Sequence, residues 1–168
     1  MSIKGYWGGN GAYKSASAVE FDIIPELLKG RIVVTNIRGC TLEKCIEQYP
    51  EIPDTANVIY IDTSVAGSMD KLQTWFRWAP HGSLIVLDEI QNIHRQAWRE
   101  KDLQKFILKV EVNGVKREAT YEEAEQLGQP YDFLDAFTRH RHFNWDIVFT
   151  TPNIKYLRTD IRNTTEIA

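Results

Sequence analysis

Apolar residues occur along the chain in short runs separated by amphipathic segments. Five runs have the length of a strand: Ile3–Trp7, Arg31–Asn36, Asn57–Asp62, Ser83–Asp88 and Asp146–Thr151. None of them alternates strictly between apolar and polar positions, which is typical of strands that are buried on both faces of a parallel sheet. Because helical segments separate the strands, the pattern predicts βαβ units and a layered α/β domain.

The segments between these runs have helical spacing. Ser15–Leu28 places its apolar residues on one helical face, and Pro25 is expected to kink or divide that helix. Thr41–Gln48 begins with a residue that caps helices well. Met69–Trp78 and Pro130–Arg141 are also predicted to be mainly helical.

One segment departs from the α/β alternation. Within Phe106–Ala119, Val112 and Val115 flank the dipeptide Asn113–Gly114, which is the strongest short signal for a β-hairpin. We expect a small antiparallel insertion here. The whole chain of 168 residues has the length of a single domain, which would then span residues 1–168.

Composition and charge narrow the class of protein. With 43% hydrophobic and 26% charged residues, the chain resembles ordinary soluble globular proteins. The formal net charge of −3 does not support direct nucleic-acid binding, although the basic run Arg139–His142 leaves it open. The apolar runs are too short to cross a membrane and no signal peptide is visible, so Cys40 and Cys45 are expected to be reduced cytosolic thiols.

Residues 8–15, GGNGAYKS, approximate the phosphate-binding loop (P-loop) pattern G-x-x-x-x-G-K-[ST]. Tyr13 stands where the second glycine belongs. The loop lies between a predicted strand and a predicted helix, which is the context that such a site requires. In this interpretation Lys14 binds the terminal phosphates and Ser15 binds Mg²⁺. The predicted nucleotide-binding residues are Gly8, Gly9, Asn10, Gly11, Ala12, Tyr13, Lys14, Ser15 and Ala16.

A second motif, LIVLDE, ends the fourth predicted strand in two carboxylates. Asp88 is the predicted metal-binding partner of Ser15, and Glu89 is the predicted catalytic residue that orients and activates the attacking water. Two strands lie between the motifs and a fifth follows, as in nucleoside triphosphatases (NTPases) with an extra central strand. Thr151 and Asn153, near the end of that fifth strand, are the candidate sensors of the terminal phosphate.

Three further features have both an ordinary and a functional interpretation. The basic run Arg139–His142 suits a solvated helix end, or could supply an arginine to a neighbouring subunit. Arg158 and Arg162 are weaker candidates for the same role. For the aromatic cluster of Trp75, Phe76 and Trp78, a place in the core or at an interface is favoured over a functional role.

In order along the chain, GGNGAYKS, LLKGRIVVTNIRG, SLIVLDEIQNI, HRHFNWDIVFTTPN and DIR resemble the Zot (zonula occludens toxin) family, which includes filamentous-phage assembly proteins. The likeness covers essentially the whole chain. It implies a three-layer α/β/α P-loop NTPase with a mainly parallel five-stranded sheet. It also implies ATP and Mg²⁺ as cofactors, a site formed by Lys14, Ser15, Asp88 and Glu89, and catalytic Arg141 acting on a neighbouring subunit.

The resemblance further implies an ATPase motor domain on the cytoplasmic side of the bacterial inner membrane that serves filamentous-phage assembly and export. Its expected partners are further copies of itself and other phage assembly proteins or virion components. Family members continue into a transmembrane helix and a periplasmic segment, so this sequence is expected to be the N-terminal cytoplasmic part. Any toxin activity would belong to the other part.

The sequence departs from the family pattern at three positions. Tyr13 replaces a loop glycine, Asn10 stands where proline is frequent, and Pro152 follows the threonines where many members carry glutamine. Tyr13 motivates a second hypothesis, a nucleotide-independent assembly scaffold with a degenerate P-loop. A third, a small P-loop phosphotransferase, is less favoured because the Asp88–Glu89 pair suits attack by water.

Overall fold

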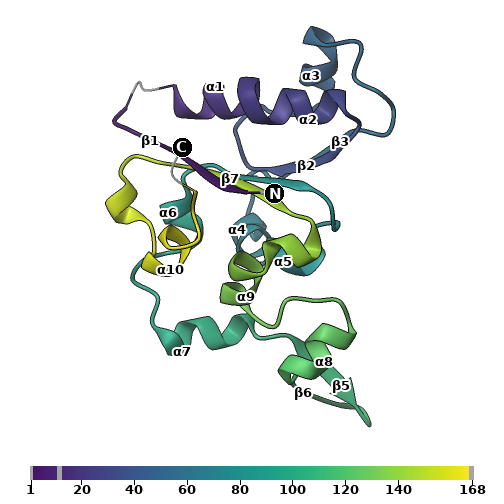
Figure 1. The fold of residues 1–168 in the computed structure, drawn as a ribbon, viewed down its shortest axis with the longest axis vertical. Helices are drawn as coiled ribbons and strands as arrows, with labels where there is room; N and C mark the ends of the chain where they lie inside the picture. The colour runs from purple at the N-terminus through teal and green to yellow at the C-terminus, as the bar shows by residue number, and fades with distance from the viewer. Residues whose placement is uncertain (1, 11–12, 167–168) are drawn as a thin grey trace.

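A five-stranded parallel sheet forms the centre of the molecule (Figure 1). The computed structural model describes residues 2–10 and 13–166. The strands are β1 (Ile3–Trp7), β2 (Ile32–Thr35), β3 (Asn57–Tyr60), β4 (Leu84–Leu87) and β7 (Asp146–Thr151). Their order in the sheet is β1-β7-β4-β2-β3. The predicted sheet is therefore confirmed, and the last strand lies between the strands that carry the two sequence motifs.

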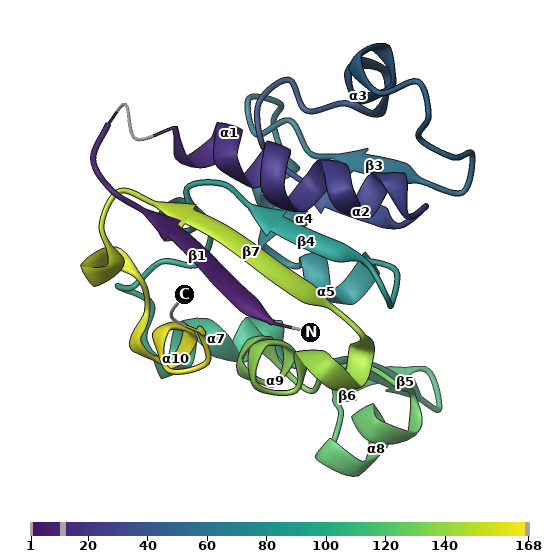
Figure 2. The ribbon, with the colours of Figure 1, turned by 45° about the horizontal axis from the view of Figure 1, so that its top comes forward.

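Helices cover both faces of the sheet, which confirms three layers (Figure 2). On one face lie α1 (Lys14–Ala18), α2 (Ile24–Leu28) and α3 (Leu42–Gln48). On the other face lie α4 (Ser68–Gln73), α5 (Trp75–Trp78), α6 (Ile90–Ile93), α7 (Glu100–Leu103), α9 (Phe133–Thr138) and α10 (Thr159–Arg162). The helical layers explain why the strand sequences lack strict alternation, since both faces of the sheet are buried.

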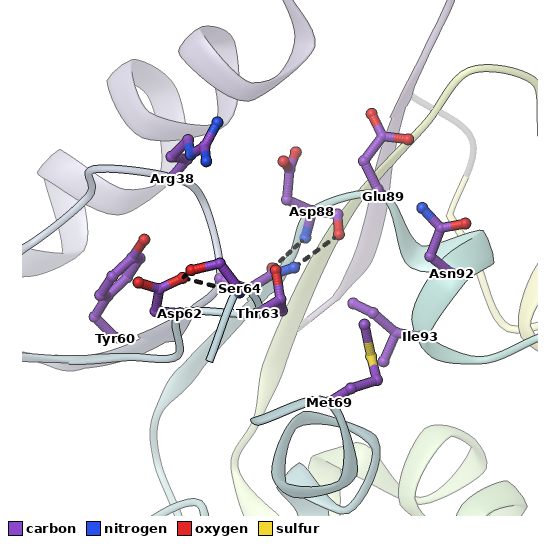
Figure 3. A pocket seen from close by; sticks show the side chains of 11 residues that line it. Arg38, Tyr60, Asp62, Thr63, Ser64, Met69, Asp88, Glu89, Asn92 and Ile93 are labelled. Atoms are coloured by element: carbon purple, nitrogen blue, oxygen red, sulfur yellow. Dashed lines mark hydrogen bonds between the residues drawn. The ribbon is translucent and has the colours of Figure 1, made fainter. Parts of the chain in front are cut away.

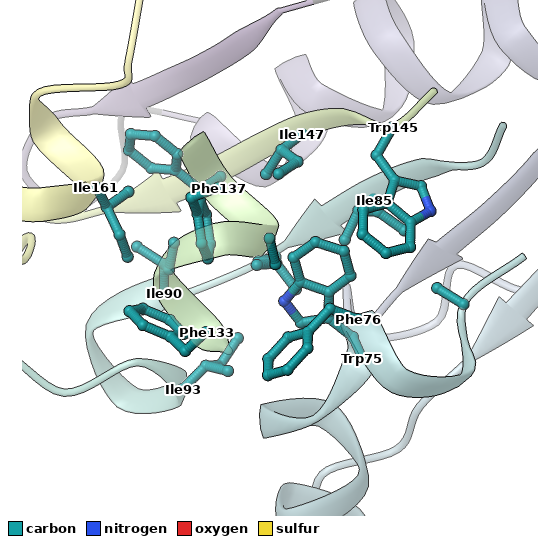
Figure 4. Close-up of a cluster of buried hydrophobic side chains, with 14 of the residues drawn as sticks. Trp75, Phe76, Ile85, Ile90, Ile93, Phe133, Phe137, Trp145, Ile147 and Ile161 are labelled. Carbon is teal, nitrogen blue, oxygen red and sulfur yellow. The ribbon is translucent and has the colours of Figure 1, made fainter. Parts of the chain in front are cut away.

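Strand β4 shows how the sheet divides the interior into two cores. Leu84 and Val86 pack with the α1–α3 layer, whereas Ile85 and Leu87 pack with the opposite layer. All four side chains are at most 3% exposed. Aromatic residues fill the larger core, where Trp75 makes edge-to-face contacts with Phe76, Phe137 and Trp145 (Figure 4). Trp75 and Phe76 are thus core residues, which agrees with the expectation of a core or interface position, whereas Trp78 is half-buried.

The first helix is modified where the sequence predicts a disturbance. A wide π-helical turn, Val19–Ile23, separates α1 from α2, and Pro25 lies in the first turn of α2. Proline has no N–H group, so the α-helical hydrogen bond to the Phe21 carbonyl cannot form. The π-helical turn lies where this hydrogen bond is missing, and the chain remains helical from Lys14 to Leu28.

Two other predicted helices are shorter than their patterns suggest. The segment Met69–Trp78 is divided at Thr74, whose hydroxyl donates to the carbonyls of Asp70 and Lys71 at 3.0 and 3.2 Å. Such back-bonding by threonine competes with helical hydrogen bonds. The segment before β7 ends in a 3₁₀ turn, His140–Phe143, instead of continuing α9.

The predicted hairpin is present. It consists of β5 (Lys109–Val112) and β6 (Val115–Glu118), joined by Asn113 and Gly114 with φ of 52° and 78°. Two consecutive positive φ values are characteristic of a type I′ turn. The hairpin projects with α8 (Tyr121–Gln126) away from the sheet (Figure 1).

Arg77 of α5 fastens the insertion to the body. Its guanidinium donates to the carbonyls of Phe106, Pro130 and Tyr131 at 2.5–3.0 Å. Burial lowers the pKa of Arg77 to about 10, against the opposing effect of nearby Asp132 and Asp135, so the group stays charged at neutral pH. The ends of the insertion are therefore held by charge-assisted hydrogen bonds.

Arg31 ties together the amino ends of three strands. Its guanidinium lies 2.6 Å from both the Gly82 carbonyl and the Asp146 carboxylate. Burial would raise the pKa of Asp146, but hydrogen bonds from Arg31 and the Ser2 amide outweigh it and hold the pKa below its ordinary value. The ion pair therefore adds stability at neutral pH that is lost on acidification through the lowered pKa.

Candidate functional site

The P-loop connects β1 to α1 at the carboxyl edge of the sheet. Gly11 and Ala12 lie outside the described residues. Lys14 is the first residue of α1, and its ammonium group donates to the carbonyls of Gly8 and Gly9 at 2.9 and 3.2 Å. The cation is thus held over the loop by weak neutral acceptors, from which an anionic phosphate would attract it.

Tyr13 precedes Lys14 in a left-handed conformation, with φ 54° and ψ 31°. This is the backbone conformation that glycine adopts without strain, and it costs a residue with a Cβ roughly 1–2 kcal/mol. The side chain is 80% exposed, so it projects into solvent and does not fill the loop. The tyrosine therefore preserves a glycine-like backbone, and strained conformations of this kind are concentrated at functional sites.

We expect Tyr13→Gly to stabilise the fold by about 0.5–1 kcal/mol. Relief of the left-handed strain outweighs the entropy that glycine adds to the unfolded chain, and the exposed ring has little packing to lose. Urea unfolding of the wild type, Tyr13→Gly and Tyr13→Ala measures this, with the alanine variant retaining the strain as control. A Tyr13→Gly variant less stable than wild type would show that the ring makes contacts that its exposure conceals.

Asp88 forms hydrogen bonds with residues from three other segments of the site. Its Oδ1 accepts hydrogen bonds from Ser15 Oγ and Thr150 Oγ1, both at 2.6 Å. Its backbone is fixed by Asn36, whose side-chain amide donates to the Asp88 carbonyl and accepts from the Asp88 N–H. The structure thus brings Ser15 and Asp88 together, and places both beside the tips of β2 and β7.

Ser15 and Asp88 suit a magnesium ion. Hydroxyl and carboxylate oxygens are donors that Mg²⁺ prefers, and the ion normally takes few protein ligands together with waters and substrate phosphates. Among residues 2–10 and 13–166, no cluster of three or more His, Cys, Asp or Glu could hold a metal by itself. The donor set therefore fits an ion that is shared with a phosphate ligand.

Cys40 and Cys45 are free and buried.

Glu89 immediately precedes α6 and is the second residue near this site in a left-handed conformation, with φ and ψ of 54°. Its N–H donates to Thr150 Oγ1 at 2.9 Å, and its Oε2 accepts from Gln91 Nε2 at 2.5 Å. The half-buried carboxylate is thus aimed by a strained backbone and two polar contacts, as expected of a preorganised functional group.

The far end of α6 is anchored in the aromatic core. His94 is fully buried and accepts a hydrogen bond from Trp75 Nε1 at 3.2 Å. Burial, with a smaller effect of the nearby Arg158 charge, lowers the pKa of His94 to about 3. The imidazole is therefore neutral. Its contact with Trp75 ties the end of α6 opposite Glu89 to the aromatic core.

The two candidate sensors, Thr151 and Asn153, contact each other and neither Asp88 nor Glu89 among the hydrogen bonds of the described residues. Thr151 Oγ1 donates to the Asn153 carbonyl at 3.3 Å, and the Asn153 side chain accepts from the Lys155 N–H. It is the neighbouring Thr150 that contacts both Asp88 and Glu89. Because adjacent strand residues point to opposite faces, the register of β7 decides which threonine reaches the site.

The structure does not bring Arg141 to this site within one chain. Arg141 lies in the turn leading into the amino end of β7, whereas Asp88 and Glu89 follow the carboxyl end of the parallel strand β4. Its side chain is 69% exposed and lies 3.5 Å from Glu166. Arg158 is engaged with Asp160 and with the carbonyls of Arg95 and Trp98, and Arg162 donates to the Leu157 carbonyl.

A cavity of about 230 Å³ opens beside Asp88 and Glu89 (Figure 3). Its lining residues come from the ends of β2, β3 and β4 and from α4 and α6. Its lining includes three carboxylates, those of Asp62, Asp88 and Glu89, and the guanidinium of Arg38. The cavity therefore places a polar, partly enclosed space next to the cluster of Ser15, Asp88 and Thr150.

Comparison with known proteins agrees with this architecture. The family model for zonular occludens toxin (Zot) matches residues 2–168. The zona occludens toxin of Vibrio cholerae is 29% identical over 167 residues, which cover 99% of this chain and 39% of that protein. The chain thus spans about two fifths of the curated relative it matches.

Two solved structures share the fold. The N-terminal domain of zonular occludens toxin from Neisseria meningitidis superposes with a TM-score of 0.50 at 18% identity, covering 98% of this chain and 73% of that one. The genome packaging NTPase of Sulfolobus turreted icosahedral virus 2, in complex with AMPPCP, gives a TM-score of 0.52 at 14% identity, with 98% and 71% covered. These likenesses confirm the predicted three-layer α/β/α fold with its mainly parallel five-stranded sheet.

Proposed function

This chain belongs to the zonular occludens toxin (Zot) family, and from that premise we propose that it is the ATP-hydrolysing motor domain of a protein for filamentous-phage assembly and export. One observation carries the proposal. The hydroxyls of Ser15 in the P-loop and Thr150 in β7 both donate to one oxygen of Asp88. Lys14 is the neighbour of Ser15 in the chain, and Glu89 is the neighbour of Asp88. These are the parts that phosphoryl-transfer sites require.

In the proposed site the chain's own residues bind and orient the triphosphate. Lys14 leaves the Gly8 and Gly9 carbonyls for the β- and γ-phosphates. Ser15 and Asp88 would hold Mg²⁺, and the ion would supply positive charge to the phosphate oxygens. Thr150 keeps its hydroxyl between Asp88 and the Glu89 backbone, so the metal-binding carboxylate and the catalytic one move as a unit.

Glu89 supports the proposed chemical step. Its carboxylate orients a water molecule and accepts a proton as the water oxygen bonds to the γ-phosphorus. The bond to the bridging oxygen breaks, ADP leaves with the electron pair, and phosphate is released. The hydrogen bond from Gln91 holds the carboxylate in place before the proton arrives.

The partners and location belong to the same proposal. A homo-oligomer would let exposed Arg141 reach the nucleotide of an adjacent copy, since it does not reach the site of its own chain. The proposed place is the cytoplasmic side of the bacterial inner membrane, with phage assembly proteins or virion components as partners. Among the described helices, none is long and apolar enough to cross a bilayer.

Calorimetric titration of this chain with Mg-ATP tests the proposal. We expect saturable binding that weakens when Mg²⁺ is chelated, because Ser15 and Asp88 would bind the ion only together with the phosphates. Absence of binding at millimolar Mg-ATP would favour the nucleotide-independent scaffold instead.

A further inference from the structure

Arg38 lies at the carboxyl edge of the sheet, beyond the end of β2. Two residues before it, Asn36 pairs through its side chain with both backbone groups of Asp88, at 2.7 and 2.9 Å. These paired hydrogen bonds continue the contact between β2 and β4 beyond the last strand residues. The start of the loop that carries Arg38 is therefore fixed relative to Asp88 and Glu89.

Arg38 lines two cavities near the carboxyl edge of the sheet. One is the cavity beside Asp88 and Glu89, across which Arg38 lies opposite the two carboxylates (Figure 3). The other is lined by Ser15 and Ala16 at the start of α1. The Arg38 side chain thus lines both the cavity that Asp88 and Glu89 border and the cavity that Ser15 borders.

The charges around Arg38 are unbalanced. Among the described residues that line the first cavity, Arg38 is the single cation facing three carboxylates, Asp62, Asp88 and Glu89. Its side chain is exposed, and its guanidinium has no hydrogen bond in the described part of the chain. It is attracted electrostatically to the Asp62 carboxylate. Arg77 and Arg158, by contrast, are occupied by several acceptors.

We propose that Arg38 binds the terminal phosphate of a nucleoside triphosphate held by the same chain, and so distinguishes the triphosphate from the diphosphate. The inference rests on the proposed function and adds a residue to it. A guanidinium presents a planar fork of donors that matches a phosphate, and it is always charged. A γ-phosphate near Ser15 and Asp88 would face this fork, whereas a diphosphate would end short of it.

The experiment measures affinities of this chain for Mg-ADP and for Mg-AMPPNP, a triphosphate analogue that resists hydrolysis. We expect Arg38→Ala to weaken AMPPNP binding by roughly 10- to 100-fold, the range for a lost charge-assisted hydrogen bond, and to change ADP binding less than about twofold. Arg38→Lys should restore part of the preference, because it keeps the charge without the fork. Arg95→Ala, which removes another exposed arginine, is the matched control and should leave both affinities unchanged.

The outcomes separate the inference from its premise. If the wild type binds both nucleotides and Arg38→Ala weakens both equally, or neither, the assignment of Arg38 to the terminal phosphate is wrong while the nucleotide site stands. If the wild type binds neither nucleotide, the proposed function fails and the assignment with it. Thermal unfolding of each variant confirms that the fold is retained.

Discussion

Replacement of Lys14 by alanine is expected to weaken Mg-ATP binding at least about 100-fold, which corresponds to about 2.7 kcal/mol. The ammonium group donates to two backbone carbonyls of the loop. In the proposed complex these contacts, in which only the donor is charged, are exchanged for hydrogen bonds to phosphate oxygens, in which donor and acceptor carry opposite charges. The variant loses the stronger set and the attraction between opposite charges.

The same replacement should change the free energy of unfolding by less than about 0.5 kcal/mol. Lys14 is partly exposed, and the carbonyls that lose its ammonium group can bind water instead. Calorimetry and urea unfolding measure the two quantities on the same sample. Lys29→Ala is the control, because Lys29 lies on the same helical path, is 70% exposed and pairs only with Glu26 among the contacts described. Equal nucleotide affinities of wild type and Lys14→Ala would remove Lys14 from the site.

Most of the sheet could be predicted from the sequence because each strand is a local feature. β7 has the predicted bounds and β4 differs from its prediction by one residue at each end. The order of the strands is a different matter, since it depends on how distant segments pair. The insertion of β7 between β1 and β4 follows from the motif class and not from periodicity.

The parts that the sequence missed are those decided by tertiary contacts. Thr150 and Thr151 are equivalent by composition, and only the register of β7 against β4, which pairs Phe149 with Leu87, directs Thr150 to Asp88. The helices α6, α7 and α10 each have four residues, which is too short for a helical period to be recognised. Their positions are set by packing of the large aromatic core.

Tyr13 shows the limit of a motif comparison. The pattern identifies a missing glycine, but the property that the loop needs at this position is a backbone conformation. In the structure Tyr13 adopts it, with φ 54°, and its ring is directed into solvent. A loop that was closed by the tyrosine side chain would need the ring turned inward, and the Tyr13 side chain is 80% exposed.

Replacement of Glu89 by glutamine is expected to lower kcat for ATP hydrolysis about 10³-fold, or about 4 kcal/mol in activation free energy, with Mg-ATP affinity changed less than about threefold. Glutamine has the same shape, so the left-handed backbone at the start of α6 and the Thr150 hydrogen bond to the Glu89 N–H can persist. It cannot accept a proton from the attacking water, so only the chemical step is affected. Single-turnover hydrolysis and calorimetry on wild type and variant, in the oligomeric state that supports turnover, separate chemistry from binding.

Glu100→Gln is the matched control for this replacement, because Glu100 is exposed in the first turn of α7 and its loss removes the same charge from the chain. It should keep the wild-type rate. Retained turnover in purified Glu89→Gln would assign the activation of water to another group, and loss of nucleotide binding would show that Glu89 acts on the ground state as well. The expected combination of intact binding and lost hydrolysis arises only if Asp88 and Glu89 divide the work. Their geometry supports that division, since Asp88 faces the Ser15 hydroxyl while Glu89 is turned toward Gln91.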